Sequence, residues 1–282
     1  MTAASPAGSV DDGAGSPVGT APILSVTGLT KRFGSRTAVT DVTFDLPAGG
    51  SLGIVGESGA GKTTVARMIA GLEVPTAGSI VCCGRDRSAP ARKTAERRVR
   101  GREVQIVFQD PYSSLDRRQS AAASLDEILR LHDGGTSQQR AARVAELADL
   151  VGLDERQVRA LPRAMSGGQR QRVAIARALA ARPSVLILDE SVSALDVSIQ
   201  AQILNLLADI REQTGLSYLL ISHDLAVVRQ LAEQAIVMYD GRIVDQGPIA
   251  ELLDNPQHDY TRLLRASVPA PGWKPSRRLR AS

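Results

Sequence analysis

The chain has 282 residues, of which 43% are hydrophobic and 23% are charged, enough to bury the core of one large domain with a subdomain. Its net charge of +4 and its 3% aromatic content give no support to nucleic-acid binding, which needs a strongly basic surface or stacking platforms. The two cysteines, Cys82 and Cys83, are adjacent and cannot form an ordinary framework disulfide, which indicates a reducing cytosol. No apolar run approaches the ~18 residues of a membrane span. Residues 1–22 are mostly Ala, Gly, Ser, Pro and Thr, and this composition predicts a disordered leader.

Short apolar segments alternate with helical patterns along the rest of the chain. Strands are predicted over residues 23–29, 42–46, 51–55, 104–108, 185–188 and 217–222. Helical patterns cover residues 63–72 and 120–161. A hairpin is predicted over residues 235–244, because the dipeptide Asp240-Gly241 suits a type I′ turn. Buried strands separated by helices predict an α/β fold with a mostly parallel sheet and a helical insert.

A glycine-rich loop follows the predicted strand 51–55. Residues 56–63 fit the pattern G-x-x-x-x-G-K-[ST] between a strand and a helix, which is the context that this phosphate-binding motif requires. Glycines let backbone N–H groups surround phosphates without Cβ clashes, and the helix N-terminus adds favourable dipole charge. We expect Lys62 to reach the β- and γ-phosphates and the Thr63 hydroxyl to bind Mg²⁺. Ser58 and Thr64 are predicted to add further phosphate contacts.

Two carboxylates end the predicted strand 185–188. The carboxyl ends of parallel strands are where ligands bind in α/β sheets. Asp189 is therefore predicted to hold Mg²⁺, and Glu190, which points the other way, to polarise the attacking water as a general base. Two neutral groups follow neighbouring strands: Gln109 is expected to touch Mg²⁺ or water, and His223 to lie beside the γ-phosphate. His132 and His258 show no such setting and are interpreted as surface or packing residues.

A second glycine-rich helix start lies downstream of the phosphate-binding loop. It consists of Met165, Ser166, Gly167, Gly168 and Gln169. Its small residues and helix N-terminus suit a phosphate group. Because one loop already holds one triphosphate, this segment is predicted to close on the γ-phosphate of a nucleotide bound by a partner subunit.

These motifs, in this order, resemble those of the ATP-binding cassette (ABC) ATPases over residues 23–268. The resemblance implies a P-loop, RecA-like core with a mostly parallel sheet, an antiparallel β subdomain and an α-helical subdomain. It identifies residues 56–63 as Walker A, Gln109 as the Q-loop glutamine, residues 165–169 as the signature, residues 185–190 as Walker B, residues 193–196 as the D-loop and His223 as the switch histidine. It also implies ATP and Mg²⁺ as cofactors and a head-to-tail dimer of two cassettes, with Phe33 stacking on adenine.

The predicted site residues fall into three groups. The catalytic residues are Glu190, His223 and Gln109, and the metal ligands are Thr63, Gln109 and Asp189. The nucleotide-binding residues are Phe33, Gly56, Glu57, Ser58, Gly59, Ala60, Gly61, Lys62, Thr63, Thr64, Ser166, Gly167, Gly168 and Gln169. The predicted domains are the leader 1–22, a catalytic core over 23–115 and 163–254, a helical subdomain over 116–162, and a C-terminal extension with a basic tail over 255–282.

Three stretches are similar to those of the oligopeptide, dipeptide and nickel importer ATPases. These stretches are residues 108–115, 193–202 and 255–261, followed by residues 263–269. The resemblance implies a subunit on the cytoplasmic face of the cell membrane that drives peptide import, with a second, different ATPase, two transmembrane permease subunits, a solute-binding protein and no nucleic acid as partners. The alternatives left open are nickel, glutathione or another small solute as cargo, a second identical cassette, and a soluble ABC ATPase without a transport role.

Overall fold

The computed structural model describes residues 21–110, 115–193 and 195–266. The strands are β1 (Leu24–Phe33), β2 (Arg36–Leu46), β3 (Ser51–Val55), β4 (Ala77–Cys82), β5 (Arg85–Asp86), β6 (Val104–Val107), β7 (Val185–Asp189), β8 (Ser217–Ser222), β9 (Gln234–Tyr239) and β10 (Arg242–Pro248). The helices are α1 (Lys62–Ile69), α2 (Thr94–Glu103), α4 (Ala121–His132), α5 (Ser137–Leu150), α6 (Glu155–Arg159), α7 (Gly167–Ala180), α8 (Val197–Thr214), α9 (Leu225–Leu231), α10 (Ile249–Asp254) and α11 (Asp259–Ala266), with a 3₁₀ turn η1 at Pro162–Ala164.

The central sheet has six strands in the order β10-β9-β3-β8-β7-β6, and only its β10–β9 pair is antiparallel. Its inner strands β3, β7 and β8 are buried on both faces, as strands of parallel sheets covered by helices are. Asp240 and Gly241 both have positive φ (44° and 75°) at the β9–β10 turn, as a type I′ hairpin requires. The predicted α/β class and this hairpin are therefore confirmed.

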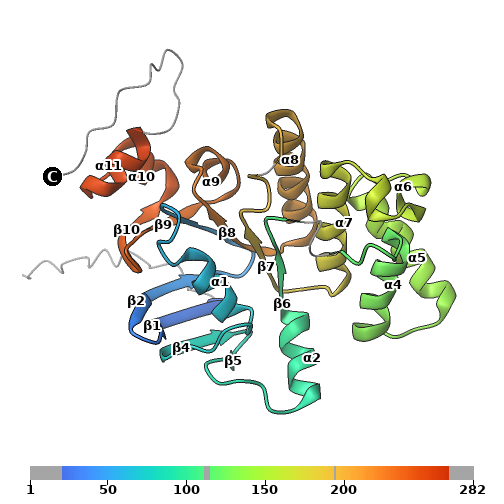
Figure 1. Cartoon of the computed structure of the whole chain (residues 1–282), viewed down its shortest axis with the longest axis horizontal. Coiled ribbons are helices and arrows are strands. Elements are labelled where there is room, and N and C mark those ends of the chain that lie inside the picture. Colours follow the sequence, from blue (N-terminus) through green and yellow to red (C-terminus); the bar gives the residue numbers. More distant parts are fainter. Residues whose placement is uncertain (1–20, 111–114, 194, 267–282) are drawn as a thin grey trace, which may run out of the picture.

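A second sheet has four antiparallel strands in the order β2-β1-β4-β5. Helix α1 lies between the two sheets and shares one hydrophobic core with both, through Val65, Met68 and Ile69 on the helix (Figure 1). Strand β4 and helix α2 were not predicted, and β2 begins six residues earlier than the predicted strand 42–46.

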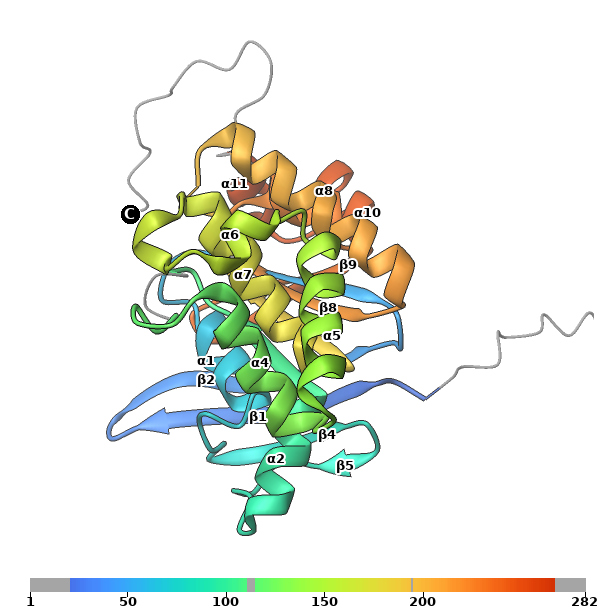
Figure 2. The same cartoon turned by 90° about the vertical axis from the view of Figure 1, so that its right-hand side faces the viewer.

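Helices α4, α5 and α6 lie together beside α7, at the side of the molecule away from β10 and α11 (Figures 1 and 2). They share the other large core with α7, α8, α9 and the opposite face of the central sheet, where Leu186, Leu188 and Leu220 point. The exact boundaries of the predicted domains stay a prediction, and the leader and the tail beyond residue 266 lie outside the described residues. No helix in the described part of the chain combines the length and apolarity that crossing a bilayer requires.

Candidate functional site

The phosphate-binding loop connects β3, at the centre of the large sheet, to α1. Gly56 has a φ of 152°, and a Cβ there would lie 2.2 Å from the Met238 carbonyl oxygen at the end of β9. Gly61 has a φ of 98°, and a Cβ there would lie 2.6 Å from the Ala38 carbonyl oxygen of β2. Both positions therefore need glycine for steric reasons as well as for the backbone conformation. The loop is wedged between the ends of two strands.

Lys62 is enclosed by this loop. Lys62 is only 4% exposed, and its Nζ donates to the carbonyl oxygens of Gly56 (2.8 Å) and Glu57 (2.9 Å). Burial lowers the pKa of the Lys62 ammonium group, while the charges of Glu190, Asp189 and Glu57 act in the opposite direction. A cation held by two neutral carbonyls and desolvated in this way is well placed to gain from an approaching polyanion.

Asp189 and Thr63, two of the predicted metal ligands, lie in contact at the edge of the sheet. The Thr63 hydroxyl donates to Asp189 Oδ1 at 3.1 Å, and Asp189 is 5% exposed. Burial raises the pKa of the Asp189 carboxyl, and the hydrogen bond from Thr63 partly counters this rise. A carboxyl whose folded pKa lies above its unfolded value subtracts from folding stability once the pH rises through the unfolded pKa. The ionised Asp189 thus costs stability, which points to a chemical role for it.

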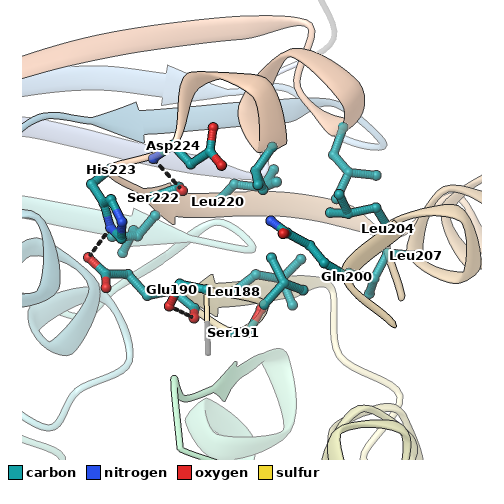
Figure 3. A pocket seen from close by; sticks show the side chains of 15 residues that line it. Leu188, Glu190, Ser191, Gln200, Leu204, Leu207, Leu220, Ser222, His223 and Asp224 are labelled. Carbon is teal, nitrogen blue, oxygen red and sulfur yellow. Dashed lines mark hydrogen bonds and ion pairs between the residues drawn. The ribbon is translucent and has the colours of Figure 1, made fainter. Parts of the chain in front are cut away.

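Glu190 and His223 point toward one another from the ends of β7 and β8 (Figure 3). His223 Nδ1 lies 3.3 Å from Glu190 Oε1. The backbone of Glu190 is left-handed, with a φ of 47°, and its N–H donates to the Ile221 carbonyl of β8 at 2.9 Å. Such a conformation costs of order 1–3 kcal/mol for a residue other than glycine. Glu190 also lines the space next to Lys62 and Thr63 of the phosphate-binding loop.

Gln109, two residues past the end of β6, contacts the segment that follows Glu190. Its Nε2 donates to Ser193 Oγ at 3.3 Å, and Ser193 Oγ in turn donates to the Glu190 carbonyl oxygen at 2.9 Å. Ser193 thus connects Gln109 with the backbone of Glu190. Ser193 lies in the predicted D-loop, and no local sequence pattern reveals its contact with Gln109. Residues 111–114 and 194, on which parts of the Q-loop and D-loop predictions fall, lie outside the described residues.

A pocket of about 400 Å³ opens over the phosphate-binding loop, a size that suits a small ligand. Its lining includes Phe33, Lys62, Thr63 and Glu190. Phe33 is 47% exposed, which leaves its ring accessible for stacking, and Lys31 Nζ lies 4.8 Å from the ring centroid. The pocket also contains Arg36, which the sequence analysis missed although it pairs directly with Phe33 across the β1–β2 hairpin.

The second glycine-rich segment lies elsewhere on the molecule, since none of its residues is among those that line this pocket. Ser166 caps α7 with a capping box: its hydroxyl accepts from the Gln169 N–H, and the Gln169 side chain accepts from the Ser166 N–H. Gly168 is buried, and a Cβ there would lie 2.7 Å from Ile199 Cγ2 of α8. Packing against α8 therefore requires this glycine, whereas Ser166 is exposed to solvent.

Residues 39–193 match the model of the ABC transporter family. The chain is 49% identical over 250 residues to the oligopeptide transport ATP-binding protein OppD of Mycobacterium tuberculosis, a match that covers 89% of this chain and 40% of the relative. It is 46% identical over 261 residues to the glutathione import ATP-binding protein GsiA of Escherichia coli, covering 88% of this chain and 41% of the relative. The chain thus spans about two fifths of the length of these relatives.

Solved structures share the fold. The ATP-binding cassette MJ0796, in a dimeric post-hydrolysis state bound to ADP and phosphate, aligns with a TM-score of 0.72 and 28% identity over 80% of this chain and 98% of its own. The protein cbiO1 of Clostridium perfringens, part of an ABC transporter complex, aligns with a TM-score of 0.75 and 25% identity over 84% of this chain and 92% of its own. The predicted cassette fold is confirmed.

Proposed function

The chain belongs to the ABC transporter family, and on that premise we propose that it is the ATP-hydrolysing subunit of an importer for oligopeptides or dipeptides. One observation carries the ATPase part of the proposal: β3, β7 and β8 end at one edge of the sheet and bring the Lys62 ammonium, the Thr63–Asp189 pair and the Glu190–His223 pair around one loop. A cation, an oxygen-rich ion site and a carboxylate base are the groups that phosphoryl transfer to water requires.

The chemistry follows from this arrangement. The loop N–H groups and Lys62 bind the phosphates of ATP and stabilise the negative charge that shifts during transfer. Glu190 orients the attacking water and accepts its proton, and His223, in contact with that carboxylate, donates to the γ-phosphate. Gln109 responds to changes at the site, because its hydrogen bond to Ser193 connects it to the backbone of Glu190.

The residues present also fit Mg²⁺. The Thr63 hydroxyl and the Asp189 carboxylate provide adjacent oxygen donors, and we propose the Gln109 amide oxygen as a third. No group of three or more His, Cys, Asp or Glu within the described ranges could hold an ion by itself. This fits an ion that takes its remaining ligands from phosphate and water. Bound there, Mg²⁺ would neutralise charge on the β- and γ-phosphates.

The pocket over the phosphate-binding loop is lined by residues of β1, β2, the loop with the start of α1, and Glu190. The signature residues 165–169 of the same chain do not line it. We propose that the Ser166 segment of a second cassette closes each pocket, so that ATP binding draws two cassettes together and hydrolysis releases them. The exposed Ser166 hydroxyl and the N-terminus of α7 suit a phosphate. We expect the second cassette to be a different chain.

The cargo proposal rests on similarity in sequence. The relative OppD is named for oligopeptide transport, and this supports peptides. The relative GsiA is named for glutathione import, and glutathione is a small peptide, so glutathione is the second candidate. Nickel or another small solute is the remaining alternative. The chain would act on the cytoplasmic face of the membrane with two permease subunits and a solute-binding protein.

Isolation of the tagged chain from native membranes in mild detergent is expected to recover two multi-spanning subunits and a second cassette protein. Mass spectrometry identifies these proteins, and the same tag on Lys62→Ala serves as the control, since assembly should not depend on nucleotide binding. The ligand of an accompanying solute-binding protein would name the cargo. A purely soluble complex, or one that contains nucleic acid or ribosomes, would refute the transport role and leave the ATPase.

A further inference from the structure

The C-terminal helix α11 reaches the start of the phosphate-binding loop. The hydroxyl of Tyr260, in the first turn of α11, accepts a hydrogen bond of 2.9 Å from the Glu57 N–H, 203 residues away in the sequence. Tyr260 is 8% exposed, whereas Glu57 is an exposed residue, so the bond is partly buried. A side chain far away in the sequence thus supplies the acceptor for this backbone N–H. In this structure the N–H of Glu57, one of the predicted nucleotide-binding residues, therefore donates to α11.

Helix α11 is itself fixed to the edge of the central sheet. Asp245 Oδ2 on β10 accepts from the Thr261 hydroxyl (2.9 Å) and from the His258 N–H (3.3 Å). Thr261 is 1% exposed. His258 Nδ1 also accepts from the Tyr260 N–H at 3.1 Å, which fixes the first turn of the helix. From its sequence context His258 is a surface or packing residue, whereas in the structure its ring accepts a hydrogen bond in this turn.

Asp245, which anchors α11, is connected to the start of the phosphate-binding loop by residues paired across neighbouring strands. Asp245 pairs with Val237 of β9, and Val237 pairs with Val55, the last residue of β3 before the loop. Tyr260 also contacts β9 directly, because its ring packs on Tyr239 with ring centroids 4.5 Å apart. Figure 1 shows α11 and α10 beside β10 and β9, on the side of the molecule opposite the helical subdomain. A chain of contacts thus runs from β10 through α11 to Glu57.

We propose that Tyr260 is a positioning residue for the phosphate-binding loop, and that α11, anchored at Asp245, holds the first turn of that loop in the shape that receives phosphate. This inference rests on the proposed binding of ATP by the loop. Without the Tyr260 hydroxyl, the Glu57 peptide is free to rotate and the loop populates more conformations, so binding must order it at a free-energy cost. The effect falls on nucleotide affinity, because Glu190 and His223 are fixed by β7 and β8.

Tyr260→Phe tests the proposal, since it removes the hydroxyl and keeps the ring against Tyr239. We expect the Kd for Mg²⁺ and a non-hydrolysable ATP analogue to rise about three- to tenfold, which corresponds to the loss of one hydrogen bond. The KM for ATP should rise by a similar factor, and kcat at saturating ATP should change less than about twofold. Thr261→Val, which removes one of the two hydrogen bonds to Asp245 at nearly constant side-chain volume, should weaken binding in the same direction.

Tyr239→Phe is the matched control, because it removes the other hydroxyl of the aromatic pair and leaves the bond to Glu57 intact. Unchanged affinity in Tyr260→Phe, or an equal loss in Tyr239→Phe, would overturn the proposal. A lower melting temperature in Tyr260→Phe with unchanged affinity would likewise show that Tyr260 only packs. If the unmodified chain binds no ATP analogue, the proposed function itself is wrong, whereas binding that is lost in Lys62→Ala but normal in Tyr260→Phe refutes this inference alone.

Discussion

Glu190→Gln is expected to slow ATP hydrolysis by about 10²–10⁴-fold while ATP binding is retained. The amide keeps the size of the carboxylate, but it cannot accept the proton of the attacking water. The 3.3 Å contact between His223 Nδ1 and Glu190 Oε1 and the left-handed backbone at Glu190 place this side chain at the strand end beside the phosphate-binding loop. Steady-state phosphate release and equilibrium binding of ATP, measured on the same preparation, separate the two effects.

The matched control is Glu233→Gln, the same chemical change at an exposed glutamate that pairs with Arg211. It should leave turnover within about twofold of the unmodified chain, because exposed ion pairs contribute little. Near-normal hydrolysis in Glu190→Gln would rule out a general-base role for this carboxylate. A loss of ATP binding in that variant would instead indicate that Glu190 supports the loop structurally.

Lys62→Ala is expected to abolish tight nucleotide binding, weakening it by about 10²-fold or more. Hydrogen bonds from an ion to a charged partner are each worth about 1.5–3 kcal/mol, and each 1.4 kcal/mol is a factor of ten in Kd. Lys62 now bonds to the carbonyls of Gly56 and Glu57, two neutral acceptors that it exchanges for phosphate oxygens. Titration calorimetry with Mg²⁺ and an ATP analogue measures the change.

Lys93→Ala, at an exposed lysine that precedes α2, is the control and should bind nucleotide normally. Circular dichroism of both variants establishes that each is folded, which matters because Lys62 also binds two backbone carbonyls of the loop. A folded Lys62→Ala chain with unchanged affinity would contradict the assignment of residues 56–63 as the phosphate-binding loop.

Strongly patterned segments were predictable, and segments defined by tertiary contacts were not. Strand β8 has the predicted bounds because all six of its residues are buried, and the apolar run 218–221 is bounded by a serine at each end. Strand β4 escaped prediction because only Ile80 and Cys82 of its six residues are buried. Helix α2 has no apolar periodicity. Instead, Arg100 donates to the carbonyls of Asp86 and Ala89, which fixes the helix to the preceding loop.

The candidate site follows the same rule. The residues at strand ends were predictable, because parallel strands bring their carboxyl ends to one edge, and the Thr63–Asp189 contact agrees with that reasoning. The contact of Ser193 with Gln109 and that of Tyr260 with Glu57 join residues 84 and 203 positions apart. Nothing in the local sequence encodes such pairs, since a tyrosine in an amphipathic helix is equally consistent with ordinary packing.

The central claim is that two cassettes complete each ATP site, and Ser166→Arg in the purified assembly tests it most directly. The matched control is Thr136→Arg, which removes the same kind of capping box from α5 and adds the same side chain. The account predicts that Ser166→Arg lowers ATP turnover by about 10²-fold, the scale of losing a group that stabilises transition-state charge. Its own chain should still bind ATP normally, and Thr136→Arg should retain turnover. Normal turnover in Ser166→Arg, or loss of ATP binding by the altered chain itself, would contradict a site shared between two cassettes.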